Sequence, residues 1–99
     1  MRDSDNSLDK MLRAIADPTR RRILVALKAR GGCSIGKGAG LCASDIEAHI
    51  QLSQPTISHH MAVLRRCGLV EAKKVGQWMW YRRNEVALRQ LYRGLRKNL

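Results

Sequence analysis

The residues best suited to contact chemistry lie in one stretch, 53–66, which reads SQPTISHHMAVLRR. At about 100° per residue, a helix here would place Ile57, Met61 and Leu64 on one apolar face. The other faces would carry hydroxyl, amide, imidazole and guanidinium groups and no carboxylate, which suits contact with a polyanion. The candidate DNA contacts in this stretch are Ser53, Gln54, Thr56, Ser58, His59, Ala62, Arg65 and Arg66.

These residue types fit the two kinds of contact that a DNA-reading helix makes. Gln54 suits bidentate hydrogen bonding to adenine, and a residue as small as Ala62 lets the helix approach the bases closely. Arg65 and Arg66 can pair with phosphates, and the free N–H groups at the helix N-terminus can bind another. The simpler interpretation of the same pattern is a solvated helix face.

Cys33 and Cys42 offer a second kind of chemistry, because the glycine-rich segment 31–40 could bring their sulfurs together. Two thiolates could bind a soft ion such as As(III). They could instead form a reversible disulfide or polysulfide. The simpler alternative is that Cys42 is a small buried residue and Cys33 has no role. Cys67 is predicted to be a small residue at a helix end.

Other chemistry finds little support in the sequence. Residues 31–37 nearly match a phosphate-binding P-loop, but Gly38 stands where that motif needs Ser or Thr to hold Mg²⁺. His59 and His60 are adjacent, so on a helix they face different directions and make a poor metal-ligand pair. His60 is expected at the edge of the apolar face. No arrangement of Ser, His and acid stands out, so an enzyme is not predicted.

Helical periodicity and capping residues predict the elements that position these groups. Apolar residues at helical spacing predict a first helix over 8–16. Asp17 and Pro18 then read as the N-cap and first position of a second helix. Ser44 and Glu47 match a capping box at the start of a short third helix, which ends near residue 50. Ser53 can cap the fourth helix, which Gly68 closes.

A β-hairpin and a final helix complete the pattern. Residues 70–75 and 78–83 read as two strands around a turn at Gly76. Trp78 and Trp80 indicate that one face of the hairpin packs inward. The more specific alternative is that they form a platform on which the bases of single-stranded nucleic acid stack. Asn84 can cap the last helix. The residues at or near the hairpin tip that could reach a minor groove or the phosphate backbone are Lys73, Lys74 and Gln77.

The predicted order is α-α-α-α-β-β-α, a mainly α fold with a small β-hairpin. Two short helices joined by a tight turn and followed by a hairpin describe a winged helix-turn-helix. At 99 residues, the chain is expected to be a single domain, 1–99, that both binds DNA and dimerises.

The charge distribution supports a nucleic-acid partner. The net charge is +11, and residues 52–99 carry ten basic and two acidic side chains against nine and six in residues 1–51. Such asymmetry is expected of a polyanion binder. The first residues are polar, and no apolar run approaches the roughly 20 residues that span a bilayer. We therefore expect a cytoplasmic protein with reduced thiols and no membrane partner.

Three stretches resemble the ArsR/SmtB family of winged helix-turn-helix repressors: residues 15–24, 41–46 and 52–70. The resemblance implies a homodimeric repressor that binds double-stranded DNA at an imperfect inverted repeat and is released by an inducer. It also implies a dimer interface formed mainly by the first and last helices. The interface residues expected on this basis are Leu8, Met11, Leu12, Ile15, Leu88, Leu91, Tyr92 and Leu95.

The resemblance leaves the inducer open. Family members that sense metals or metalloids often carry Cys-x-Cys or Cys-x-x-Asp at the third helix, and here Cys42 is followed by Ser44 and Asp45. The second thiolate is therefore missing, and Cys42 with Asp45 supplies only two of the four ligands of a closed zinc site. The family's other metal site is absent, because residues 84–99 contain neither Asp nor His.

Three functional hypotheses follow from the sequence. The first is a repressor released by As(III) or a divalent metal ion, or by thiol oxidation at Cys33 and Cys42. The second is a constitutive architectural DNA-binding protein without an inducer. The third is a metal-binding or thiol-reactive protein for which DNA is incidental.

Overall fold

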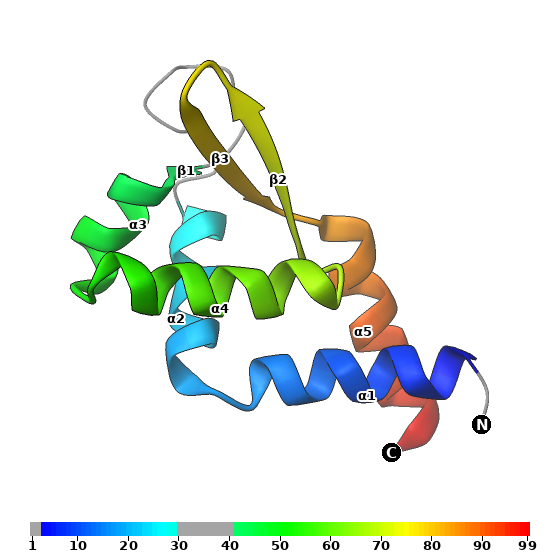
Figure 1. Cartoon of the computed structure of the whole chain (residues 1–99). Helices are drawn as coiled ribbons and strands as arrows, with labels where there is room; N and C mark the ends of the chain where they lie inside the picture. Colours follow the sequence, from blue (N-terminus) through cyan, green and yellow to red (C-terminus); the bar gives the residue numbers. More distant parts are fainter. Residues whose placement is uncertain (1–2, 30–40) are drawn as a thin grey trace.

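A computed structural model describes residues 3–29 and 41–99 of the chain (Figure 1). It confirms a mainly helical fold with a β-hairpin between the fourth and fifth helices. One short strand, β1, was not predicted. Cys33 and the stretch that nearly matches a P-loop lie outside the described residues. The elements are α1 (Asp3–Ile15), α2 (Pro18–Ala29), β1 (Leu41–Cys42), α3 (Ala43–Ile50), α4 (Gln54–Arg66), β2 (Val70–Val75), β3 (Trp78–Arg83) and α5 (Glu85–Asn98).

Two predicted helix caps are confirmed. Asp17 Oδ1 accepts hydrogen bonds from the backbone N–H groups of Thr19 at 2.7 Å and Arg20 at 3.3 Å, at the start of α2. Asn84 Oδ1 accepts from the backbone N–H of Ala87 at 3.1 Å, at the start of α5. Each carboxylate or amide oxygen satisfies amide groups that have no partner within their helix.

The predicted start of α3 was wrong. The helix begins at Ala43, so Cys42 is its N-cap and Ser44 lies inside the first turn. Asp45 Oδ2 accepts from the backbone N–H of Cys42 at 3.4 Å and from its Sγ at 3.2 Å. The physical reason is β1, which pairs with β3 and carries extended backbone as far as Cys42. The acidic residue three positions after Cys42 therefore takes the role expected of Glu47.

The fourth helix starts and ends where the sequence predicted. Ser53 is its N-cap residue and Pro55 lies in its first turn. The Ser53 side chain does not bond to a backbone amide, however, because its Oγ lies 2.9 Å from Thr56 Oγ1 and the two hydroxyls pair with each other. Gly68 follows the helix with a φ of +86°, a conformation that glycine adopts without a steric penalty.

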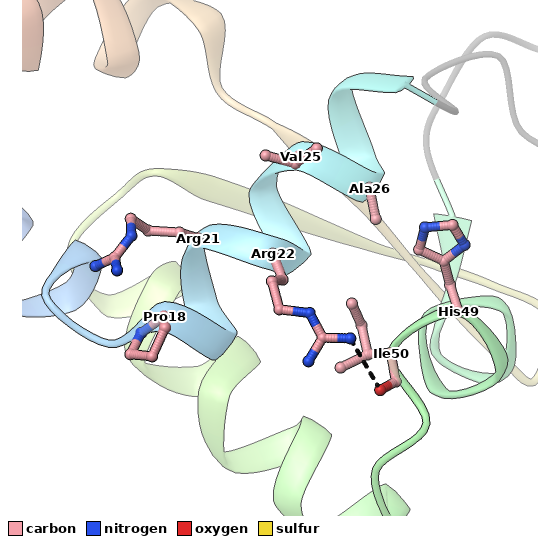
Figure 2. A pocket seen from close by; sticks show the side chains of 7 residues that line it. All are labelled: Pro18, Arg21, Arg22, Val25, Ala26, His49 and Ile50. Atoms are coloured by element: carbon pink, nitrogen blue, oxygen red, sulfur yellow. Dashed lines mark hydrogen bonds between the residues drawn. The ribbon is translucent and has the colours of Figure 1, made fainter.

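Three consecutive arginines of α2 bind carbonyl groups at the ends of other helices. Arg20 Nε donates to the Ala14 oxygen at 2.6 Å, and Arg21 Nη1 donates to the Ile15 oxygen at 2.5 Å, both in the last turn of α1. Arg22 Nη2 donates at 3.5 Å to the last carbonyl of α3, that of Ile50 (Figure 2). These carbonyls have no partners within their own helices, and the negative end of the helix dipole favours a cation there.

The core lies between the helices and one face of a three-stranded antiparallel sheet of order β1-β3-β2 (Figure 1). Tyr81 and Ala72 are paired across β3 and β2, and both face this core. Trp80 is 7% exposed whereas Trp78, near the hairpin tip, is 51% exposed. The inward packing of one hairpin face is thus confirmed, and a platform of two exposed rings is not formed. The most deeply buried large side chains are Ile23, Ile46, Ile57, Met61, Leu64 and Leu69.

Replacing Leu64 with Ala is expected to lower the free energy of unfolding by about 2–5 kcal/mol, because this fully buried side chain would leave a cavity. The neighbouring exposed change Arg65→Ala is the matched control and should stay within about 0.5 kcal/mol of the wild type. Urea denaturation at fixed protein concentration measures both. Equal losses in the two variants would contradict the assigned orientation of α4.

Candidate nucleic-acid interface

Helix α4 divides its residues sharply between core and solvent. Ile57, His60, Met61 and Leu64 are buried. Ala62, on the outer side, is half-buried. The 13-residue helix has no acidic residue in its first turn and two arginines in its last. The predicted contact residues of α4 and its N-cap that are exposed together on this outer side are Ser53, Gln54, Thr56, Ser58, His59, Arg65 and Arg66.

A tight turn joins this helix to α3, which packs against it. Gln51 ends α3 in a left-handed conformation, with a φ of +64°, and its N–H donates to the Glu47 oxygen at 2.8 Å. The chain therefore turns within residues 51–53 before α4 begins. This is the geometry of a helix-turn-helix, in which the second helix is free to enter a DNA groove.

The hairpin β2–β3 stands beside the end of α4 as a wing (Figure 1). Lys73 and Lys74 are exposed on β2, opposite Trp80 and Met79 of β3. Gln77 is exposed in the turn, where Gly76 has a φ of +61°. The three predicted wing residues are thus exposed to solvent, and they lie on a different element from the α4 residues.

The two carboxylates of residues 52–99 each lie against an arginine. Arg82 Nε donates to Glu71 Oε1 at 3.1 Å, and Arg83 Nη2 donates to Glu85 Oε1 at 3.0 Å. Exposed pairs of this kind contribute little to stability. They do confine the negative charge to the base of the hairpin and the start of α5, so the basic groups of α4 and of the wing tip keep a positive field.

Cys42 is buried, with 7% of its surface exposed. Its Sγ lies 3.1 Å from Ser44 Oγ and 3.2 Å from Asp45 Oδ2. Cys67 is half-buried and its Sγ donates to the Leu64 oxygen at 3.3 Å, as befits a small residue at a helix end. Among the side chains that the structure describes, no three His, Cys, Asp or Glu come together as a metal site. Cys42 and Asp45 are therefore adjacent, but they do not form a complete site by themselves.

His60 is buried on the inner side of α4 and has a partner that sequence reasoning missed. Arg20 Nη1 lies 3.2 Å from His60 Nδ1. Burial lowers the pKa of His60 because it disfavours the imidazolium form; Arg20 and His59 lower it further, and Asp17 opposes them. The signal available in the sequence was the position of His60 on the apolar face, since a buried imidazole needs a polar partner.

The residues expected at a dimer interface differ in exposure and fall into three groups. Met11, Leu88 and Leu91 are buried within the chain itself. Tyr92 is 54% exposed. Helices α1 and α5 contact each other, and Gly94 permits this because a Cβ there would lie 3.2 Å from a methyl carbon of Leu8. The half-buried members of the set are Leu8, Leu12, Ile15 and Leu95.

A surface hollow of about 420 Å³ lies between α2 and the end of α3 (Figure 2). Val25, Ala26 and Ile50 form its apolar part, and Arg21 and Arg22 its basic part. Both guanidinium groups are already bound to backbone carbonyls, so the hollow results from the way these arginines bind the helix ends.

None of the helices in the described part of the chain has the length and apolar composition needed to span a membrane.

Comparison with known proteins agrees with this geometry. The sequence model of the bacterial regulatory protein arsR family matches residues 17–72, which run from the N-cap of α2 into β2. The transcriptional repressor SdpR of Bacillus subtilis (strain 168) is 35% identical over 81 residues, covering 82% of this chain and 80% of the relative. The arsenical resistance operon repressor of Staphylococcus aureus is 37% identical over 92 residues, covering 93% and 80%.

Solved structures show the same fold. An ArsR-like transcriptional regulator from Rhodococcus sp. RHA1 superposes with a TM-score of 0.75 at 30% identity, covering 93% of this chain and 78% of that one. The fold and the exposed face of α4 define a winged helix-turn-helix DNA-binding protein. The chain belongs to the arsR family of bacterial regulatory proteins and is a DNA-binding transcriptional repressor rather than an enzyme.

Under native conditions, iodoacetamide should alkylate Cys67 faster than Cys42, because burial shields the Cys42 sulfur from reagent. Peptide mass spectrometry after timed quenching measures each rate. In urea, where both thiols are exposed, the two rates should converge. Faster native alkylation of Cys42 than of Cys67 would contradict its buried position.

Proposed function

We propose that this repressor acts as a homodimer that binds an imperfect inverted repeat and leaves it when an inducer acts on the protein. The observation that carries the proposal is the outer face of α4, which is exposed, free of carboxylates and flanked by a basic wing. In a dimer, two such helices would enter successive major grooves, about 34 Å apart. The roles proposed are base contacts for Gln54, Thr56, Ser58, His59 and Ala62, and phosphate contacts for Ser53, Arg65, Arg66, Lys73, Lys74 and Gln77.

The surface of α1 and α5 supports dimerisation. Apolar side chains of both helices remain partly exposed where the two helices pack together, and Tyr92 presents half of its surface to solvent. A 99-residue chain buries a modest core, so covering these side chains with a second copy would stabilise both chains. Met11, Leu88 and Leu91 would then support the interface from inside each protomer.

We place the inducer's action at Cys42, together with Cys33, which lies outside the described residues. Cys42 and Asp45 offer two donors, fewer than a closed zinc site requires, so a third group is needed for any metal. A metalloid such as As(III) is favoured slightly over thiol oxidation, since a relative from Staphylococcus aureus is an arsenical resistance operon repressor. Both reactions would draw on the same two thiols.

Cys42 is well placed to transmit such a reaction. It caps α3, the first helix of the helix-turn-helix, and its backbone pairs with Trp80 of the wing strand β3. A ligand or a disulfide at its sulfur would compete with the hydrogen bond from Sγ to Asp45. Loss of that bond would loosen the start of α3, next to both DNA-contacting elements.

Arg66→Ala should weaken binding to all duplexes and reduce the salt dependence by about one counterion, because it removes a phosphate contact. His59→Ala should instead reduce discrimination between sequences, by about 1–3 kcal/mol, because it removes a base contact. Fluorescence anisotropy against a duplex selected from a random library by the wild-type protein, and against a scrambled duplex, measures both effects at several salt concentrations.

Lys97→Ala, which removes an exposed basic residue from the last turn of α5, is the matched control and should change neither quantity. The wild-type dimer should prefer its selected duplex by roughly 10³-fold or more. Equal affinity for selected and scrambled duplexes would contradict the repressor and favour a constitutive architectural protein.

The inducer is tested by titrating the protein–duplex complex with arsenite, Zn(II), Cd(II), hydrogen peroxide and polysulfide. Release by arsenite that Cys42→Ser and Cys33→Ser abolish and Cys67→Ser retains would support metalloid sensing. The same pattern with peroxide or polysulfide alone would favour thiol oxidation. No release by any of the five reagents would contradict both.

A further inference from the structure

Arg20 connects three helices through one planar group. Its Nε donates to the Ala14 oxygen at 2.6 Å and its Nη2 to the Arg13 oxygen at 3.4 Å, both at the C-terminal end of α1. Its Nη1 lies 3.2 Å from Nδ1 of His60, on the inner face of α4. Asp17 Oδ2 lies 4.0 Å from the same nitrogen and accompanies the cation.

The direction of the contact with His60 follows from the chemistry of the two groups. A guanidinium only donates, so Nδ1 must accept, and the imidazole must be neutral with its proton on Nε2. The pair is nearly shielded from water, since the Arg20 side chain is 14% exposed and His60 is buried. Because the guanidinium group of Arg20 is planar and rigid, its three contacts fix the end of α1 and the middle of α4 relative to each other.

The position of His60 in α4 makes this link relevant to DNA reading. Its neighbour His59 is exposed on the outer face, and the residue before that, Ser58, is exposed as well. Apolar contacts of Ile57, Met61 and Leu64 hold α4 on the core, but they are non-directional and do not by themselves select among small rotations and shifts of the helix. The hydrogen bond at His60 is directional, so it restricts rotation and shift of α4 in the same turn of the helix that carries Ser58 and His59.

We propose that Arg20 is a positioning residue for operator recognition, which holds the reading face of α4 in register with α1 by binding both. The inference rests on the proposed homodimer, in which α1 contributes to the interface. Since the dimer fixes α1, the link from Arg20 to His60 sets where each recognition helix stands along the operator. Its loss impairs recognition of the correctly spaced site more than general attraction to DNA.

Protonation of His60 removes the link. The imidazolium has no acceptor at Nδ1 and stands beside a second cation. The charged or titratable groups that act on it are Asp17 and Arg20 from the start of α2, and His59 from α4 itself. Since the pKa of His60 lies below its ordinary value, the link is intact at neutral pH and is lost as the pH falls through that lowered pKa.

The experiment compares Arg20→Lys with Arg21→Lys. Both variants keep the charge and lose a guanidinium bond to the last turn of α1, but only the first loses a contact with α4. Fluorescence anisotropy at pH 7.5 measures the affinity for the wild-type-selected duplex and for a scrambled duplex. The selectivity ratio is the first affinity divided by the second, and thermal unfolding gives Tm. The ratio should fall about 10-fold in Arg20→Lys and by less than twofold in Arg21→Lys, with the Tm of each variant confirming that it is folded at the temperature of the binding assay.

Two variants of His60 separate positioning from stability. His60→Asn places an amide oxygen near Nδ1 and retains an acceptor that does not titrate, whereas His60→Leu retains an apolar side chain without one. As the pH is lowered from 8 through the depressed pKa of His60, the wild-type ratio should fall. The ratio of His60→Asn should fall less, and that of His60→Leu should be low throughout. Every variant retains His59, so the difference between the wild type and His60→Asn reports on His60 alone.

The outcomes separate this inference from the function on which it rests. A wild-type protein that prefers no duplex overturns both. A selective wild type whose Arg20→Lys variant keeps its ratio overturns the positioning role alone. So does a ratio that falls equally in Arg20→Lys and Arg21→Lys, or a pH dependence that is as large in His60→Asn as in the wild type.

Discussion

The fold depends on how the ends of its helices are satisfied. Short helices expose several carbonyls each, and a chain of this size has few elements with which to cover them. Here α2 supplies the donors: Arg20 and Arg21 bind the end of α1, and Arg22 binds the end of α3. The central helix thereby holds a neighbour on each side by directional bonds, and the apolar core fills the space between. A run of three arginines thus holds the ends of neighbouring helices together.

The division of α4 into two faces connects this architecture to function. Its inner side chains complete the core, so the outer ones are presented to solvent in a fixed order. Because helical periodicity alone assigns residues to the two faces, Gln54, Ser58 and His59 could be identified as outer residues from the sequence. Both carboxylates of residues 52–99 are paired with arginines near the base of the wing. The +8 charge of this half is therefore unopposed on the outer face of α4 and at the wing tip.

Two local capping signals were read correctly, whereas contacts between distant residues were not predicted. Asp17 and Asn84 cap their helices as predicted, because the oxygen and the amide that it binds are two or three residues apart. The start of α3 was misplaced because β1 pairs with β3, about 40 residues further along the chain, and this pairing carries extended backbone to Cys42. The contact between Arg20 and His60 escaped for the same reason, since a sequence shows that a buried histidine needs a partner but not which one.

Cys42 illustrates how one residue can belong to three structures at once. It ends β1, is the N-cap residue of α3 and pairs through its backbone with Trp80 of the wing strand. A buried thiol that is hydrogen-bonded to a carboxylate reacts slowly with reagents in solution. The Cys42 sulfur therefore reacts only with reagents that can displace its hydrogen bond to Asp45. Asp45 Oδ2 accepts both from the backbone N–H of Cys42 at the start of α3 and from the Cys42 sulfur, so a group that took the sulfur away from this carboxylate would change a contact at the start of the helix.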